Sequence, residues 1–311
     1  MFDMKFGLCL PIRLNADAQT NIKIAKRAEE LGFDSIWASD HVIVPEKRLG
    51  TFSEYFYDPF VLLSNIAAVT SRIAVGTSVI ILPYRNPVVV AKMIATLDVL
   101  SKGRVIFGVG PGWMKEEFEA LGVPVQSRGR MTNEYIKAVT TLWREDAPEF
   151  DGEFCSFSDI KFFPKPVQQP RPPIWIAGAS KYAVARAAAL GDGWQPTWVT
   201  PEDVESGIAG LKSIAKENGR DLENFTFSVR NRLKILSEKD TKTGSAKNEN
   251  DDAVFTLRGT PGEIREYINR YEETGVTHLV FDPAADDVEE IFYMMKVLAD
   301  EIIPGFKDFA G

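Results

Sequence analysis

Short apolar runs alternate with longer amphipathic segments along most of this chain. The first run, Phe6–Leu10, is followed by Gln19–Leu31, where apolar residues recur every three or four positions before Gly32. A short apolar run bounded by turn residues is typical of a buried strand, and the longer spacing is typical of a helix. The pattern predicts eight strands, over Phe6–Leu10, Ser35–Ala38, Ile73–Val79, Arg104–Val109, Pro173–Ala177, Gly193–Pro196, Phe225–Leu236 and Thr277–Phe281. The main helices are expected over Gln19–Leu31, Pro59–Val69, Pro87–Leu100, Arg130–Leu142, Lys181–Leu190, Pro201–Asn218, Pro261–Thr274 and Asp287–Ile302.

Strands that alternate with helices favour a parallel sheet. Eight such units predict a closed (β/α)8 TIM barrel that forms one domain over residues 1–311, although a doubly wound sheet stays open from the pattern alone. The Pro- and Phe-rich segment Asp146–Pro172 predicts an excursion after strand four. The polar segment Glu238–Ala253 is expected to be a mobile loop.

The composition is that of a globular protein with a full core, with 45% hydrophobic and 26% charged residues. The net charge of −8 disfavours binding to nucleic acid or a membrane surface, since both attract a basic face. Met1–Asp3 do not open a signal peptide, and no run approaches the roughly 20 apolar residues of a membrane helix. Cys9 and Cys155 have neither metal-ligand nor disulfide spacing. We therefore expect a cytoplasmic protein without a metal.

Candidate chemistry lies where the predicted strands end, because a (β/α)8 barrel places its active site at the carboxyl ends of its strands. His41 follows the second strand directly, beside Asp40. An imidazole can exchange a proton near neutral pH, and a carboxylate nearby could fix its tautomer, although neighbouring residues on an extended chain point to opposite sides. A structural role for His41 is equally supported. His278, at the start of the last strand, is interpreted as structural.

Two glycine-containing turns follow the fourth and fifth strands. Gly108–Trp113 allows a close approach of the backbone to a ligand, but a tight turn explains it as well, and its spacing is not that of a dinucleotide-binding motif. Gly178, Ala179 and Ser180 precede a helix whose free N–H groups would suit a phosphate, whereas Ser180 could equally be an ordinary N-cap.

Other conspicuous residues are less informative. Trp113, Trp194 and Trp198 could line a planar ring system. The acidic run 116–119 is interpreted as a solvated helix face rather than a catalytic dyad. The sequence contains no P-loop and no nucleophile elbow.

Several strings of residues occur in a characteristic order, and together they cover most of the chain. They are Ala28–Trp37, Ser39–His41, Gly76–Val79, Arg85–Pro87, Gly103–Arg104, Gly108–Trp113, Glu117–Gly122 and Pro172–Gly178. In this order and spacing, the chain resembles the luciferase-like monooxygenase superfamily, and in particular its branch that depends on coenzyme F420.

The resemblance implies a (β/α)8 barrel that holds FMN or the deazaflavin F420 at the strand ends. It implies cofactor contacts from Thr77, Ser78, Val79, Gly110, Pro111, Gly112, Ala177, Gly178, Ala179 and Ser180. In deazaflavin-dependent members, the segment that matches residues 77–79 contains a non-proline cis peptide, which would here join Ser78 to Val79. His41, with Asp40, matches a histidine that holds the ring or polarises the substrate.

One position departs from the family pattern. F420-dependent sugar-phosphate dehydrogenases have a glutamate after the glycine run, where this chain has Trp113. We therefore do not expect a sugar phosphate, since a bulky indole favours a more apolar substrate.

The choice of cofactor decides the reaction. F420 transfers two electrons as a hydride, whereas reduced FMN activates oxygen. The strings around Ser78 and His41 favour F420 and hydride transfer to or from a small organic substrate, and Arg13, Arg85 and Lys181 are available for the anionic tail of the coenzyme. An FMN-dependent monooxygenase supplied by a partner reductase is the alternative.

Two other functions stay open at this point. The chain could bind a flavin without turnover, or act without redox chemistry on a phosphorylated metabolite.

The oligomeric state is a separate question. Related barrels commonly form dimers through helices of their first half. The apolar segments Pro59–Thr70 and Pro87–Leu100 suit a homodimer, although packing in the core explains them equally well.

Overall fold

The computed structural model describes residues 4–236 and 254–306. Within these ranges, eight parallel strands form the barrel: β1 (Lys5–Cys9), β2 (Ser35–Ala38), β3 (Ala74–Thr77), β5 (Val105–Gly110), β8 (Ile174–Ala177), β9 (Gly193–Gln195), β10 (Thr226–Ile235) and β12 (His278–Pro283). The ring closes because β10 pairs with both β9 and β12, and β12 pairs with β1. The predicted (β/α)8 barrel is therefore confirmed, and the doubly wound sheet is excluded.

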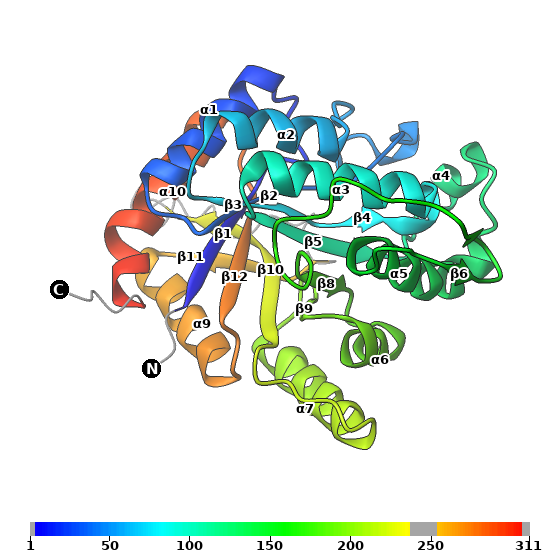
Figure 1. Cartoon of the computed structure of the whole chain (residues 1–311). Coiled ribbons are helices and arrows are strands. Elements are labelled where there is room, and N and C mark those ends of the chain that lie inside the picture. Colours follow the sequence, from blue (N-terminus) through cyan, green and yellow to red (C-terminus); the bar gives the residue numbers. More distant parts are fainter. Residues whose placement is uncertain (1–3, 237–253, 307–311) are drawn as a thin grey trace.

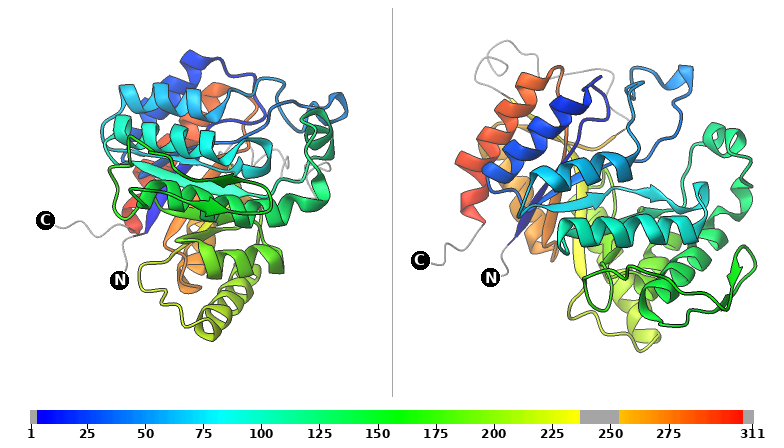
Figure 2. Two further views of the ribbon diagram at one scale, coloured as in Figure 1. Left: turned by 45° about the vertical axis from the view of Figure 1, so that its right-hand side comes forward. Right: turned by 45° about the horizontal axis from the view of Figure 1, so that its top comes forward.

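Helices surround the strands in all three views (Figures 1 and 2). They are α1 (Ala18–Glu30), α2 (Pro59–Val69), α3 (Pro87–Ser101), α5 (Arg128–Arg144), α6 (Lys181–Leu190), α7 (Pro201–Glu217), α9 (Pro261–Glu273) and α10 (Val288–Val297). The short helix α4 (Lys115–Ala120) and the segment between β2 and α2 extend beyond the same end of the barrel (Figures 1 and 2). None of the helices in the described ranges is long and apolar enough to cross a bilayer.

The structure differs from the predicted elements at three places. The third strand ends at Thr77, and Ile80–Ile81 form a separate short strand, β4; the Ser78–Val79 peptide between them is cis. The predicted excursion contains an antiparallel pair, β6 (Phe150–Asp151) and β7 (Ser156–Phe157). An unpredicted strand, β11 (Thr256–Gly259), pairs with β10 outside the ring. The predicted loop Glu238–Ala253 lies outside the described residues.

Local sequence signals position the helices as predicted. Asp58 caps α2 by accepting hydrogen bonds from the first-turn amides, and Pro59 occupies the first helical position, where no amide donor is needed. In the barrel interior, His278 is buried, and its Nε2 lies 2.7 Å from the Ser35 hydroxyl, which also accepts a bond from the Trp37 indole. These contacts agree with a structural role for His278.

Candidate active site

A pocket of about 1020 Å³ opens at the carboxyl ends of the barrel strands. Ten of the sequence-predicted site residues line it: Asp40, His41, Ser78, Val79, Gly110, Pro111, Gly112, Ala177, Gly178 and Ser180. Thr77 and Ala179 are not among the lining residues. The Thr77 hydroxyl donates to the Gly108 carbonyl at 2.8 Å and so ties β3 to β5, whereas Ala179 is exposed.

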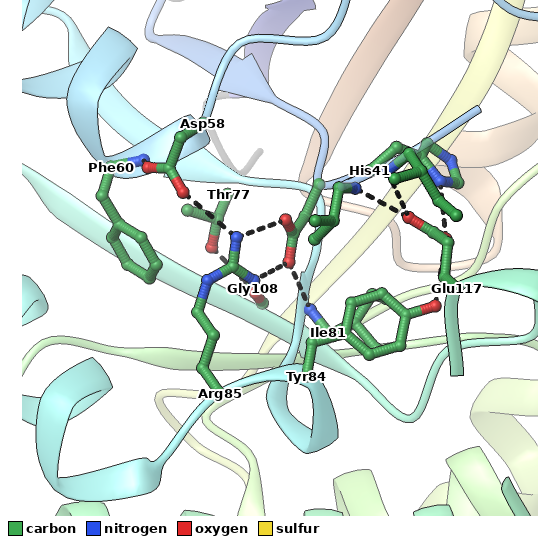
Figure 3. A network of polar contacts seen from close by, with 12 residues as sticks. His41, Asp58, Phe60, Thr77, Ile81, Tyr84, Arg85, Gly108 and Glu117 are labelled. Carbon is green, nitrogen blue, oxygen red and sulfur yellow. Dashed lines mark hydrogen bonds and ion pairs between the residues drawn. The ribbon is translucent and has the colours of Figure 1, made fainter. Parts of the chain in front are cut away.

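The pocket wall presents His41 against a buried carboxylate. His41 Nδ1 lies 3.0 Å from Glu117 Oε2, as Figure 3 shows. The side chain of His41 is 12% exposed and that of Glu117 only 1% exposed, so the pocket reaches the imidazole but not the carboxylate. With Nδ1–H donating to Glu117, Nε2 is the ring nitrogen left to accept or return a proton.

Glu117 accepts hydrogen bonds from further donors as well. Its Oε1 accepts the backbone N–H of Val42 at 2.7 Å, and its Oε2 accepts the Tyr84 hydroxyl at 3.0 Å (Figure 3). Burial alone would raise the pKa of Glu117, but the hydrogen bonds from His41, Val42 and Tyr84 outweigh it and lower that pKa. Burial, followed by the charge of Glu117, raises the pKa of Tyr84. The carboxylate is therefore ionised where it touches the imidazole.

The sequence interpretation of the acidic run as a solvated face is wrong for Glu117. Helix α4 buries Glu117 together with Phe118. A signal for this burial was present in the sequence, because Met114, Phe118 and Leu121 form an apolar stripe at helical spacing and Glu117 falls within it.

Asp40 does not take the predicted place beside the imidazole. Its two oxygens accept bonds from Arg85 at 2.6 and 2.8 Å, and one also accepts the Ile81 amide at 3.0 Å. Arg85 reaches Asp58 as well (Figure 3). Burial raises the pKa of Asp40, and the bonds and charge of Arg85 oppose that rise. Asp40 thus holds the backbone after β3, and Arg85 is committed to these two carboxylates rather than available for an anionic ligand.

A polar network lies under the pocket around Ser78. The cis peptide between Ser78 and Val79 confirms the expectation from the resemblance. The Ser78 carbonyl accepts bonds from the Ser39 hydroxyl at 3.1 Å and from Arg230 Nη1 at 2.5 Å. Arg230 is buried in β10 and pairs with Asp282 at 3.0 Å. This arginine lines the pocket and was missed from the sequence.

Gly110 and Gly112, at the end of β5 and just after it, leave no room for a side chain at this wall of the pocket. A Cβ at Gly110 would lie 2.9 Å from the Val79 side chain. At Gly112 it would lie 2.6 Å from Ile81, and the backbone there has a φ of +76°, which side chains with a Cβ rarely adopt. Backbone, rather than side chains, therefore faces a ligand over this wall.

The α5–α6 side of the pocket is cationic. Arg128 and Arg186 line it, and neither pairs with a carboxylate within the described ranges. Arg186 is only 7% exposed, and burial lowers its pKa. Helix α6 begins at the same side, where Ser180 acts as the N-cap to the Ala183 amide. Of the cations expected for an anionic tail, Lys181 is not a lining residue.

The pocket wall around His41 is aromatic. The imidazole centroid lies 5.1 Å from Phe52, 4.9 Å from Phe56 and 6.4 Å from Trp113. Trp113 and Trp198 line the pocket, whereas Trp194 is buried and donates to the Gly178 carbonyl at 2.8 Å. The described residues contain no cluster of His, Cys, Asp and Glu suited to a metal.

Comparison with known proteins agrees with this architecture. The model of the family "Luciferase-like monooxygenase" matches residues 4–242. An F420-dependent glucose-6-phosphate dehydrogenase of Amycolatopsis mediterranei is 27% identical over 91% of this chain and 93% of that protein. An FMNH2-dependent dimethylsulfone monooxygenase of Pseudomonas putida is 28% identical over 96% of this chain and 85% of that protein.

A solved structure shares the fold at low sequence identity. An F420-dependent secondary alcohol dehydrogenase, in complex with an F420–acetone adduct, has a TM-score of 0.82 at 20% identity, over 98% of this chain and all of that one. The closed barrel, with its pocket at the strand ends, is that of a (β/α)8-barrel enzyme. The chain belongs to the luciferase-like monooxygenase family, which includes F420-dependent enzymes and FMN-dependent monooxygenases.

Proposed function

We propose that this chain is an oxidoreductase that transfers a hydride between coenzyme F420 and a small organic substrate. The observation that carries the proposal is the pair His41–Glu117, with Nδ1 and Oε2 3.0 Å apart and the imidazole in the pocket wall. Loss of hydride from an alcohol carbon requires that the hydroxyl proton go to a base. Glu117 orients such a base and stabilises its protonated form.

The lining residues fit a cofactor with a planar ring and a phosphate. Gly110 and Gly112 leave no side chain where the ring would approach the wall beside Val79. Arg128 and Arg186 supply two guanidinium groups without a carboxylate partner in the described part of the chain, beside the start of α6. A phosphate would neutralise these groups and also meet the free amides of the first helical turn.

Each residue then has a defined task. Bound F420 supplies a two-electron hydride acceptor. The substrate hydroxyl donates to His41 Nε2, and its proton passes to that nitrogen as the carbon-bound hydrogen leaves with its electron pair. A carbonyl compound is the product. In the reverse direction, protonated His41 returns the proton to the carbonyl oxygen. Glu117 keeps Nδ1 protonated throughout.

An FMN-dependent monooxygenase is the second candidate. The 28% identity with an FMNH2-dependent monooxygenase, over almost the whole chain, supports it, and FMN carries the same kind of ring and phosphate. In this function a separate reductase would supply the reduced flavin, and His41 would act on the oxygenated substrate instead.

Equilibrium titration separates the two candidates. The purified protein is titrated with F420 and, separately, with FMN, and the dissociation constants are read from the fluorescence change. A dissociation constant for F420 about 100-fold below that for FMN, a difference of about 2.7 kcal/mol, supports the proposal. Preference for FMN favours the monooxygenase, and binding of neither refutes both.

We also propose that the protein is a homodimer through α2 and α3. These helices pack side by side and expose large apolar side chains on their outer faces: Val61 is 72% exposed, Val89 48% and Leu100 60%. These exposed apolar side chains on two neighbouring helices are the basis of the proposed interface.

A further inference from the structure

We infer that Arg130 is a third anion-binding residue of the pocket and that Glu153 competes with the bound ligand for it. The inference rests on the proposed function in one respect, because it takes the ligand to be a cofactor with an anionic side chain. It also gives a role to the excursion between α5 and β8, residues 146–172, which supplies Glu153.

Three arginines lie together on the α5–α6 side of the pocket. Arg128 and Arg130 flank Gly129 in the first turn of α5, and all three residues line the pocket. Arg186 reaches them from α6, since its Nη2 donates to the Gly129 carbonyl at 3.3 Å. A single phosphate carries at most about two negative charges. The third guanidinium can therefore meet a further acidic group of the ligand, or share the phosphate.

Arg130 differs from the other two arginines because a carboxylate holds it. Its Nη1 donates to both carboxylate oxygens of Glu153 at 2.5 Å, and its guanidinium lies 5.3 Å from the centroid of the Phe154 ring. Arg130 lines the pocket, whereas Glu153 does not. A ligand anion that reaches Arg130 from the pocket therefore meets a guanidinium that is already paired.

The excursion is anchored so that Glu153 stays beside this arginine. Glu134 on α5 accepts the backbone N–H groups of Glu153, Phe154 and Cys155 at 2.9, 2.7 and 2.9 Å. This close approach requires Gly152, because an added Cβ there would collide with the Glu134 carboxylate. The position of the Glu153 backbone is thus set by α5 itself, with no ligand needed.

The ion pair can be displaced by a ligand. The side chains of Arg130 and Glu153 are 63% and 55% exposed, and an exposed ion pair adds little stability. A phosphate or carboxylate of the ligand would make the same kind of charge-assisted bond to Arg130. Because Glu153 is also negative, it repels an anion at this place. It should lower the affinity for an anionic ligand and leave that for an uncharged one unchanged.

The test neutralises Glu153 and measures dissociation constants by fluorescence titration. Glu153→Gln should bind F420 about 5-fold more tightly, because Arg130 is released to the ligand. FMN ends at its phosphate, so it gains equally if Arg130 shares the phosphate and does not gain if Arg130 binds an acidic group beyond it. Riboflavin, which has the ring of FMN without the phosphate, should bind both proteins equally.

A second pair of variants shows whether Glu153 acts through Arg130. Arg130→Gln should weaken F420 binding by about 5-fold. Adding Glu153→Gln to it should change the affinity by less than about 2-fold. The matched control is Asp151→Asn, which removes an exposed carboxylate from the same hairpin and should leave F420 affinity unchanged. Damage to the fold would weaken binding, so a gain in affinity is specific.

Unchanged or weaker F420 binding by Glu153→Gln overturns the inference, and so does an equal gain in the Arg130→Gln background. If the wild type binds FMN but not F420, the proposed hydride transfer to F420 fails, and FMN titrations of the same variants decide the inference. If neither cofactor binds, calorimetric titration with inorganic pyrophosphate decides it. Tighter binding to Glu153→Gln than to wild type supports the competition, and equal or absent binding refutes it.

Discussion

Replacing Glu117 by glutamine tests the proton-accepting pair with almost no change of shape. The carboxylate accepts bonds from Val42 N–H at 2.7 Å, His41 Nδ1 at 3.0 Å and the Tyr84 hydroxyl at 3.0 Å. In Glu117→Gln the amide oxygen can still accept the Val42 bond. The amide NH2 then faces the imidazole, so Nδ1 becomes an acceptor and Nε2 carries the hydrogen. His41 Nε2 then donates a hydrogen bond and can no longer accept the substrate proton.

The magnitude follows from these contacts. A positioned acid or base contributes about 10²–10⁴-fold, so we expect kcat for alcohol oxidation to fall by about 100-fold or more. Loss of a hydrogen bond to a buried charged group should lower the free energy of unfolding by about 1.5–3 kcal/mol. The matched control is Glu119→Gln on the same helix, because the side chain of Glu119 is 61% exposed. It should alter neither value.

The pH dependence has a definite sign. Hydrogen bonds hold the pKa of Glu117 below its ordinary value of 4.5 in the folded protein, although burial opposes them. Its contribution to stability is therefore present above pH 4.5 and is lost as the pH falls through the lower, folded-state pKa. Chemical denaturation of wild type and Glu117→Gln from neutral pH to acid should show the stability difference shrinking. Unchanged kcat in Glu117→Gln, with intact folding, would refute the reasoning.

Three further predictions concern the cofactor wall, the phosphate site and the dimer. Gly112→Ala should lower the free energy of unfolding by more than Gly122→Ala, since both have positive φ but only the first added Cβ meets a side chain. Strain of this kind costs about 1–3 kcal/mol, and equal losses would contradict the contact. Arg186→Gln should weaken F420 binding in the titration by about 10-fold, as expected for one charge-assisted bond of about 1.5 kcal/mol; unchanged affinity would remove this residue from the phosphate site. Val61→Asp combined with Leu100→Asp should convert a dimer to monomers in light scattering, whereas an unchanged mass would exclude this surface.

The barrel could be predicted because parallel strands buried on both sides produce continuous apolar runs between helices. The short strand β11 could not, since within Thr256–Gly259 only Leu257 is a large apolar residue, and the strand is defined by its pairing with β10. The pattern also does not reveal the cis peptide that follows the third strand, whose presence was implied by the resemblance alone.

The site was predicted where position in the barrel decides function and missed where distant contacts decide it. His41 and the glycines directly follow strands, so the strand pattern places them at the pocket. Glu117 is 76 positions from His41, and their contact depends on how α4 packs. Arg230 lies within a strand and pairs with Asp282, 52 positions away. The sequence did not single it out, because Arg232 and Lys234 lie in the same strand.

The most direct test of the central claim follows the hydrogen itself. Wild type and His41→Gln, each loaded with F420, are mixed anaerobically with a panel of alcohols that carry deuterium on the carbinol carbon. We expect wild type to transfer deuterium to the coenzyme and the rate to fall by about 100-fold in His41→Gln, while F420 affinity is retained. Absence of deuterium in the reduced coenzyme, or an equal rate in His41→Gln, would contradict the account.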